Sequence, residues 1–327
     1  MVQNLCVPCS CRCRYCLLSW DGRPAGISWD RSASFARRFI NEVRSSHPEI
    51  STSFTFGYSM DHPHLREAIR FLKEIGSPQA QFLQCDGMRS RNEAECDDLM
   101  GMLREEGVRD LNFTFYGLKE YHDRFAARNG DYDLLMRMIR SALNHGLHIS
   151  AGIPLTVENI SQADMLIDDL KEHGVETMSV FVPHEEGRGK TLSDVRLDKK
   201  DLAGLSEESL KLLDCNIYRS EREWITCTDI PEENRRMLLV SLRPDDIERY
   251  EKMTADSIIR EIEVLDDEYY HAFPDFRELA AEYGDSESSR IYRFRDLFYH
   301  YRKLYEKDHR IQIYDVTDER QSGSRRY

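Results

Sequence analysis

The segment LHISAGIPLTVENISQADMLIDDLKEHGVETMSVFV, residues Leu147–Val182, sets the architecture of the chain. Its two ends, Leu147–Gly152 and Thr177–Val182, have the length and apolar content of β-strands. Between them, Ser161–Gly174 has a helical pattern that ends at a glycine. Two strands joined by a helix pair in parallel, because the chain crosses back over the sheet before the second strand begins. The segment therefore predicts one βα unit and the strand of the next.

The same unit recurs along the first part of the chain. Strands are also expected at Ser51–Gly57, Ala80–Gln84 and Asp110–Phe115, and the N-terminal stretch VQNLCV can serve as a first strand. Successive units start about 30 residues apart, which is the length of a βα unit. Six such units end near residue 182. Because six are too few for a full eight-stranded barrel, the sequence predicts an α/β fold, either a partial (β/α)6 barrel or an open doubly wound sheet.

The pattern changes after Pro183. Helical patterns dominate from Asp198 to the C-terminus, apart from a possible strand at Asn216–Ser220. We therefore expect two parts: a partial-barrel core over residues 1–197 and a mostly helical C-terminal extension over residues 198–327, packed on the barrel near its mouth. The aromatic helix Arg290–His309 is expected to pack its apolar face on the barrel.

Composition limits the possible locations and partners. The chain has 327 residues and contains no apolar run of the roughly 20 residues that a membrane span requires. Its N-terminus lacks the apolar core of a secretory signal, so we expect a cytoplasmic protein whose thiols stay reduced. The net charge is −14, whereas nucleic-acid binders usually carry a basic patch. Nucleic acid is therefore the least favoured partner.

The cysteines are distributed unevenly. Five of the nine lie in CVPCSCRCRYC, residues Cys6–Cys16. Clustered thiols in a reducing compartment indicate metal binding or catalysis rather than disulfides. The scattered residues Cys85, Cys96, Cys215 and Cys227 are expected to fill core positions, as small apolar side chains do.

The spacing inside the cluster allows two kinds of metal site. Cys6 with Cys9 and Cys13 with Cys16 form two CxxC pairs, but zinc ribbons separate their pairs by a dozen or more residues, and here only three lie between them. An iron–sulfur cluster suits a compact loop better. Cys9, Cys13 and Cys16 also form a CxxxCxxC spacing, with the aromatic Tyr15 before the last cysteine. In a four-iron cluster, three thiolates would bind three of the irons and leave the fourth iron open to a chelating substrate.

This motif, at the end of the first strand of a six-unit βα array, resembles the radical S-adenosylmethionine (radical SAM) superfamily over about residues 2–190. The resemblance implies one oxygen-sensitive 4Fe–4S cluster on Cys9, Cys13 and Cys16, whose open iron binds the amino and carboxylate groups of S-adenosyl-L-methionine. An electron, delivered by a donor such as flavodoxin or ferredoxin, would cleave the sulfonium bond and give methionine and a 5′-deoxyadenosyl radical. That radical would abstract hydrogen from an unidentified small metabolite or peptide.

The resemblance also points to cofactor-binding residues near the motif. Tyr15 is the aromatic residue of the motif itself. Gly57, Tyr58 and Ser59 stand where the family has a Gly-Gly-Glu type turn whose backbone meets the amino group of S-adenosylmethionine. The match is partial, because no glutamate is present. Asp86 follows the third strand and either reaches the cofactor or substrate or makes an ordinary Asp-Gly turn.

Further positions follow the fourth, fifth and sixth strands. Ser150 is the candidate for the ribose or carboxylate of the cofactor, and Val182 and Pro183 are candidates for packing on the adenine. His122 and Asp123 match a family His-Asp pair and are expected to order their loop. Arg188 could contact an anion, although a lone loop arginine is usually solvated. Gly117, Arg124 and Gly130 match the same family stretch as the His-Asp pair, and Phe181 is a further candidate for packing on the adenine.

Two functions stay open at this point. The first is a radical SAM enzyme with a single cluster, because Cys215 and Cys227 are too few to bind a second one unaided. In it Cys6 and Cys11 are spectators, and Cys6 is the first substitute if a ligand is wrongly assigned. The second is a non-catalytic metal-binding or interaction protein that has kept the fold. The altered turn at Tyr58–Ser59 is the feature that keeps this alternative open.

Overall fold

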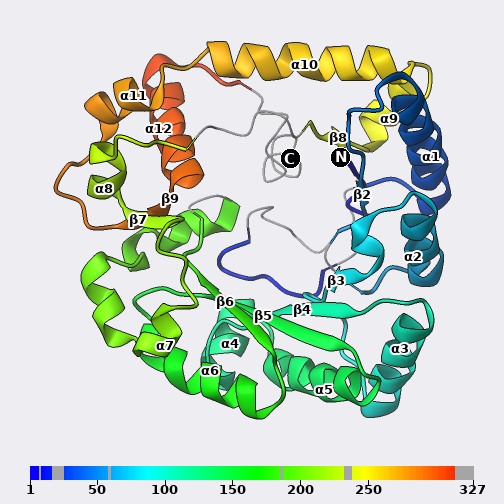
Figure 1. Cartoon of the computed structure of the whole chain (residues 1–327), viewed down its shortest axis with the longest axis horizontal. Helices are drawn as coiled ribbons and strands as arrows, with labels where there is room; N and C mark the ends of the chain where they lie inside the picture. The colour runs from blue at the N-terminus through cyan, green and yellow to red at the C-terminus, as the bar shows by residue number, and fades with distance from the viewer. Residues whose placement is uncertain (7–8, 17–25, 58–59, 185–186, 232–237, 314–327) are drawn as a thin grey trace.

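The computed structural model describes residues 1–6, 9–16, 26–57, 60–184, 187–231 and 238–313 of the chain. Figure 1 shows their helices and strands arranged as a ring, with strands on the inner side and helices outside them. No helix within the described residues has the length and apolarity needed to cross a bilayer.

One sheet lies along the lower part of this ring. Its strands are β3 (Phe82–Gln84), β4 (Asp110–Thr114), β5 (His148–Pro154) and β6 (Thr177–Phe181), and they pair in parallel in the order of the chain. The expected strand positions are confirmed here, because parallel pairing of successive strands is what repeated βα units produce.

A second parallel sheet places β1 (Val2–Gln3) between β2 (Phe54–Thr55) and β8 (Val240–Ser241). The two sheets are not hydrogen-bonded to each other within the described residues, so the barrel is open there, as expected for a partial barrel. Strand β8 lies beyond residue 197, in the expected helical extension. An isolated parallel bridge between Val180 and Leu213 likewise extends the β6 edge.

Five helices cover the outer face of the strands (Figure 1): α1 (Trp29–Ser46), α2 (Leu65–Glu74), α3 (Glu93–Glu105), α5 (Asp131–Asn144) and α6 (Ala163–Glu172). Their apolar stripes pack with the strands into the main hydrophobic core. Because strand side chains alternate between faces, every second residue joins this core and the others face the opposite way.

That alternation gives the inner face of the sheet a polar character. On β4, Leu111 and Phe113 are fully buried against the helices, whereas the intervening Asn112 is partly exposed. The register pairs Asn112 with Ser150 of β5. The inner side of the barrel is therefore lined by hydrogen-bonding groups, with these members: Gln84, Asp86, Asn112, Thr114, Ser150 and Ser179.

The C-terminal part forms a second, aromatic core. Strand β7 (Tyr218–Ser220) pairs antiparallel with β9 (Ile291–Arg293), and the long helix α12 (Phe294–His309) follows. The expectation that α12 packs its aromatic face on the barrel is wrong in the main: Phe294, Phe298 and Tyr301 pack among residues of this same region. The other helices have these bounds: α4 (Lys119–Ala126), α7 (Glu207–Leu210), α8 (Glu221–Thr226), α9 (Pro244–Tyr250), α10 (Ala255–His271) and α11 (Phe276–Tyr283).

Short 3₁₀ turns connect several of these elements. Their bounds are η1 (Pro78–Ala80), η2 (Ile160–Gln162), η3 (Gly187–Val195) and η4 (Lys199–Gly204). The turn η3 follows the β6 edge and brings its first residues back over the N-terminal cysteines, as described below.

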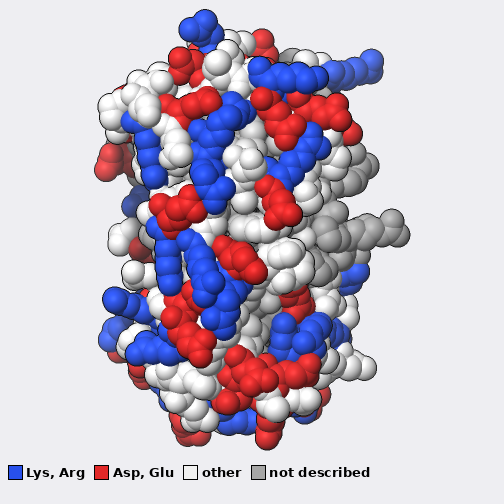
Figure 2. Space-filling view, turned by 90° about the vertical axis from the view of Figure 1, so that its right-hand side faces the viewer, with Lys and Arg blue, Asp and Glu red and all other residues white. Residues whose placement is uncertain are grey.

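Charges of both signs are intermixed on the face over α1, α2 and α3, as Figure 2 shows. Neighbouring helices are linked there by exposed ion pairs, such as Arg37 with Glu74 at 2.6 Å and Arg66 with Glu105 at 3.2 Å. Exposed pairs of this kind each contribute about 0–1 kcal/mol. This face therefore carries no extended field of one sign among its described residues.

Candidate functional site

The cysteine loop follows β1 and lies across the carboxyl ends of the neighbouring strands. The Ser10 N–H donates to the Gly87 carbonyl, just beyond β3, at 2.7 Å. The Arg12 N–H donates to the Ala126 carbonyl at the end of α4, at 2.8 Å. Carboxyl ends of barrel strands are where such folds build their sites. The strand array thus holds the loop at the expected end of the barrel.

Gly87 makes room for Cys9. Its backbone has φ +64°, a conformation that favours glycine, and an added Cβ would lie 2.3 Å from the Cys9 Sγ. No side chain fits at that distance. The Asp86-Gly87 pair is therefore more than an ordinary turn, because the missing side chain at Gly87 is what allows the cysteine loop to approach the strand end.

Tyr116, which the sequence did not single out, and Arg188 hold Cys13. The Tyr116 hydroxyl donates to the Cys13 Sγ at 3.1 Å. The Arg188 Nε donates to the Cys13 carbonyl at 2.9 Å, and its backbone N–H donates to the Cys16 carbonyl at 3.0 Å. The expectation of a solvated Arg188 is therefore wrong: this arginine fastens the end of the motif to the turn η3.

Cys11 faces a different environment from its neighbours. It is 3% exposed, and its thiol lies 3.6 Å from a carboxylate oxygen of Asp131 on α5. A hydrogen bond with Cys13, followed by burial and the charge of Asp131, raises the pKa of the Cys11 thiol. A carboxylate beside the sulfur disfavours the thiolate form that binds metal, which supports its expected spectator role.

Cys6 is paired with a histidine. Its Sγ lies 3.4 Å from the Nε2 of His62. The Nδ1 of His62 accepts the His64 N–H at 2.9 Å, so the ring proton belongs on Nε2 and points to Cys6. Burial raises the pKa of Cys6 to about 11 and lowers the pKa of His62 to about 4. This pairing explains Cys6 without a metal.

The three thiols of the motif suit a four-iron cluster by their number, because each can bind a different iron. Within the described residues, no group of three or more His, Cys, Asp and Glu side chains converges on a single-ion site. In a four-iron cluster each thiolate binds a different iron, so the sulfurs need not meet at one point. Cys9 and Cys13 pack against an apolar cluster that contains Tyr116 and Phe125. Burial raises the pKa of the Cys9 thiol to about 12, so binding must displace its proton.

Asp86 joins the ends of β3 and β4. Its carboxylate accepts the Thr114 N–H at 3.0 Å, the Thr114 hydroxyl at 2.9 Å and the Gln84 amide at 3.0 Å. Burial raises the pKa of Asp86, and these donors oppose that shift. A carboxylate has about four acceptor positions. Asp86 therefore keeps capacity for one further donor while it fixes the strand ends beside the cysteine loop.

Tyr15 sits within an aromatic wall. Its ring centroid lies 5.4 Å from that of Tyr116, 6.0 Å from Phe125 and 6.3 Å from Phe181 of β6. Burial is the main cause that raises the pKa of Tyr15. The motif's aromatic residue is thus fixed between the β4 end and the β6 end.

The other predicted cofactor residues lie at different depths. Ser150 is on the inner face, where it accepts the Asn112 amide at 2.9 Å, four residues before the end of β5. At about 3.3 Å per residue, it is roughly 13 Å from that strand end. Gly57, two residues beyond β2, has φ +109°, a backbone conformation that favours glycine. Tyr58 and Ser59 lie outside the described residues.

Val182 and Pro183 have little surface available for contact with a cofactor. The Val182 side chain is 1% exposed and belongs to the main core. The Pro183 carbonyl accepts the Arg196 guanidinium at 2.8 Å. A contact between this segment and an adenine would therefore use what backbone remains and the neighbouring Phe181, and it stays a prediction.

His122 and Asp123 order their loop, as expected. His122 is fully buried, its Nδ1 accepts the Tyr116 N–H at 3.2 Å, and its Nε2 lies 3.1 Å from Asp131. Asp123 accepts the N–H groups of Gly130 and Tyr132 at 2.7 and 2.9 Å. Asp131 also faces Cys11, so this hydrogen-bond network contacts the cysteine loop.

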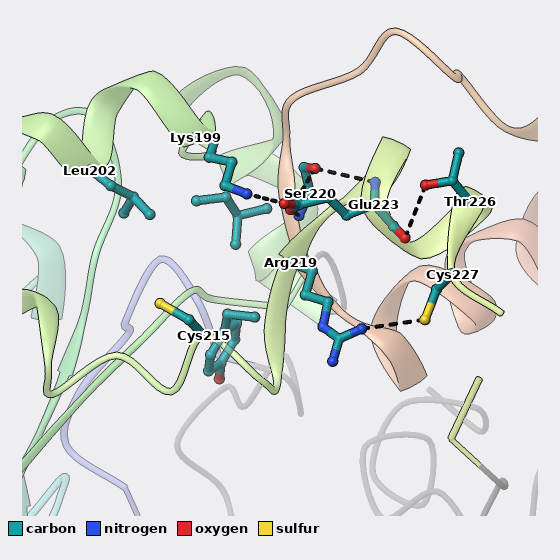
Figure 3. A pocket seen from close by; sticks show the side chains of 10 residues that line it. Lys199, Leu202, Cys215, Arg219, Ser220, Glu223, Thr226 and Cys227 are labelled. Atoms are coloured by element: carbon teal, nitrogen blue, oxygen red, sulfur yellow. Dashed lines mark hydrogen bonds and ion pairs between the residues drawn. The ribbon is translucent and has the colours of Figure 1, made fainter. Parts of the chain in front are cut away.

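The remaining cysteines divide into two kinds. Cys85 and Cys96 are fully buried, so their expected core role is confirmed. Cys215 and Cys227 instead line a cavity of about 370 Å³ in the extension, which corrects the expectation of core packing. Figure 3 shows the Arg219 guanidinium between them, and it donates to the Cys227 Sγ at 3.3 Å.

No protein-family model and no curated protein matches the chain by sequence. Its structure is similar to that of native anSMEcpe with bound AdoMet, with a TM-score of 0.51 at 12% identity, over 94% of this chain and 96% of that one. A match to Escherichia coli HemN, a coproporphyrinogen III oxidase and radical SAM enzyme, has a TM-score of 0.42 at 14% identity and covers 67% and 52% of the two chains.

A third match, to SuiB of Streptococcus suis, has a TM-score of 0.40 at 10% identity and covers 55% of this chain. The chain spans 38% of the length of SuiB. The likeness to anSMEcpe, in contrast, runs over nearly the whole of both chains. The chain therefore has the fold of the radical S-adenosylmethionine enzymes, as its cysteine motif and its repeated βα units led us to expect.

Proposed function

We propose that the chain is a radical SAM enzyme that binds one 4Fe–4S cluster through Cys9, Cys13 and Cys16. The observation that carries the proposal is the contact between the motif and the strand ends: Cys9 fits against Gly87, where any Cβ would lie 2.3 Å from its sulfur. The close approach of Cys9 to Gly87 is explained if the loop must present its thiols toward the barrel interior. The fold alone would not require it.

When bound, the cluster would supply the electron that splits S-adenosylmethionine into methionine and a 5′-deoxyadenosyl radical, which takes hydrogen from the substrate. The protein would position the cofactor and the substrate and exclude water from them. Tyr15, Phe125 and Phe181 form an apolar wall beside the motif. Such a wall keeps solvent away from reactive species.

Several side chains would hold the cofactor. Asp86 retains an acceptor position for an amino or hydroxyl group, and Gly57 would contact the cofactor through its backbone. Ser150 would bind a polar group deeper in the barrel, whereas Val182 and Pro183 would meet the adenine through their backbone. The proposed roles of Tyr58 and Ser59, which lie outside the described residues, stay predictions.

The substrate class follows from the inner face of the sheet. Gln84, Asn112 and Ser179 present hydrogen-bonding groups there. A face with this polar character favours a ligand that can hydrogen-bond to it over a purely apolar one. We infer a polar small metabolite or a peptide, with reducing power from a cytoplasmic donor such as flavodoxin or ferredoxin.

Anaerobic reconstitution tests the proposal directly. Iron and sulfide are measured per chain, and 5′-deoxyadenosine is measured after addition of dithionite and S-adenosylmethionine. The wild type should bind about four irons and form 5′-deoxyadenosine. The matched variants are Cys13→Ala, which should lose the cluster, and Cys11→Ala, which should keep it. A fully loaded wild type that yields no 5′-deoxyadenosine would sink the cleavage step.

The same preparation separates the alternative of a non-catalytic metal-binding protein. Zinc in place of iron and sulfide would favour that alternative. Its motivating feature, the altered turn at Tyr58–Ser59, lies outside the described residues.

A further inference from the structure

We propose that Tyr116 is a positioning residue that donates a hydrogen bond to the Cys13 sulfur and thereby raises the reduction potential of the cluster. The inference rests on the proposed function, because it concerns the same cluster. It adds to that function a residue outside the cysteine motif and a measurable property that this residue sets.

The main chain of Tyr116 is fixed on both sides. The residue stands two positions beyond β4 and is 3% exposed. Its N–H donates to the Nδ1 of His122 at 3.2 Å, and its carbonyl accepts the Asn159 amide at 2.6 Å. His122 and Asn159 are themselves fully buried or nearly so. The backbone of Tyr116 therefore has little freedom to move.

The ring is held as firmly as the backbone. It stacks on the His122 ring at 4.9 Å and on the Phe125 ring at 4.6 Å, with interplanar angles of 30° and 29°. The Tyr15 ring meets it edge-on at 5.4 Å. With neighbours on these sides, rotation of the ring would require repacking of the aromatic wall. The hydroxyl is consequently aimed at the Cys13 Sγ, 3.1 Å away.

The effect of this contact follows from charge. A hydrogen bond to a charged sulfur is roughly twice as strong as one between neutral groups. In a water-poor site its electrostatic effect is larger still. Reduction adds negative charge to a cluster and its thiolates, so a donor stabilises the reduced form more than the oxidised form. Hydrogen bonds to the sulfurs are one of the factors that set cluster potentials.

The test compares Tyr116→Phe with Tyr121→Phe as a matched control. Tyr121 lies in the same aromatic cluster, but its hydroxyl donates to Glu158 at 3.0 Å instead of a cysteine. Each reconstituted protein is titrated anaerobically, and its midpoint potential is read from the electron paramagnetic resonance signal of the reduced cluster. Y116F should shift to a more negative potential, while Y121F should match the wild type.

Equal potentials in fully loaded wild type and Y116F overturn this inference and leave the proposed function intact. A wild type that binds no iron and sulfide overturns the proposed function itself. A shift of the same size in Y121F also overturns the inference, because it would be a property of the aromatic cluster and not of the contact with Cys13.

A second variant decides the matter if Y116F does not assemble a cluster. Replacement of Tyr116 by 3-fluorotyrosine keeps the ring and the hydroxyl but makes the hydroxyl a stronger donor. The potential should then shift in the positive direction, opposite to Y116F. Resonance Raman spectra should show lower iron–thiolate stretching frequencies, because a stronger hydrogen bond weakens that bond. A loaded fluorotyrosine protein with wild-type potential and frequencies would overturn the inference.

Discussion

Substitution of Gly87 by alanine should damage the cysteine site much more than the fold. The new Cβ would lie 2.3 Å from the Cys9 Sγ, and ordinary contact begins at 3.4 Å, so the sulfur or the loop must retreat by about 1.1 Å. The loop cannot simply move away, because the Ser10 N–H is bonded to the Gly87 carbonyl at 2.7 Å. A ligand whose orientation is lost typically costs 10- to 100-fold in metal affinity.

Gly76 provides an unusually close control for this variant. It also has φ +64°, but an added Cβ would meet no atom within 4 Å. Alanine in this backbone conformation costs about 1 kcal/mol at either position. G76A should therefore report the backbone cost alone, and G87A the same cost together with the clash against Cys9.

Two measurements separate these contributions. Urea unfolding of the metal-free proteins should show a loss of about 1 kcal/mol in G76A and a somewhat larger loss in G87A. Iron and sulfide content after anaerobic reconstitution should be normal in G76A and strongly reduced in G87A. If G87A retains wild-type iron content at limiting iron, the contact between Gly87 and Cys9 does not govern the site and the reasoning is refuted.

Three further predictions concern groups outside the motif. Arg91→Ala should lower the free energy of unfolding by about 3 kcal/mol in urea titrations, because it removes the charged partner, 2.5 Å away, of the nearly buried Asp61 carboxylate. Burial lowers the pKa of His62 from 6.5 to about 4, so between these pH values the unfolded chain binds a proton that the folded chain does not. The free energy of unfolding should therefore fall as the pH drops from 6.5 to about 4, and His62→Gln should remove this pH dependence. Iodoacetamide should label the exposed Cys215 of the folded protein well before the fully buried Cys85, as peptide mass spectrometry would show; equal rates would contradict the structure.

The repeated βα units could be predicted because each carries its own local signal. Strand β4 is expected at Asp110–Phe115 and runs over Asp110–Thr114, because its apolar residues Leu111 and Phe113 alternate with polar ones. Strand β8 gave no such signal. It has two residues, Val240 and Ser241, and it is a strand only because it pairs with β1, far away in the sequence. Its existence is decided by tertiary packing, which no local pattern encodes.

The candidate site divides in the same way. The cysteine spacing is local, so Cys9, Cys13 and Cys16 could be proposed from the motif. The partners of the loop are not local: Gly87, Tyr116 and Arg188 come from three different strand ends that only the sheet brings together. For Gly87 and Tyr116 the available signal was a position just after a predicted strand, because the carboxyl ends of parallel strands share one edge. Arg188 lies further along, in the turn η3, and carried no such signal.

The pairing of β8 with β1 changes how the C-terminal part should be regarded. The expected boundary near residue 197 separates a core from an extension, yet Val240 pairs with Val2 and both belong to the main hydrophobic core. Ile258 and Ile262 of α10 lie in that same core, and α10 packs beside α1. β1 leads directly into the cysteine loop. The extension therefore stabilises the strand that leads into the motif, and the site depends on residues of both the core and the extension.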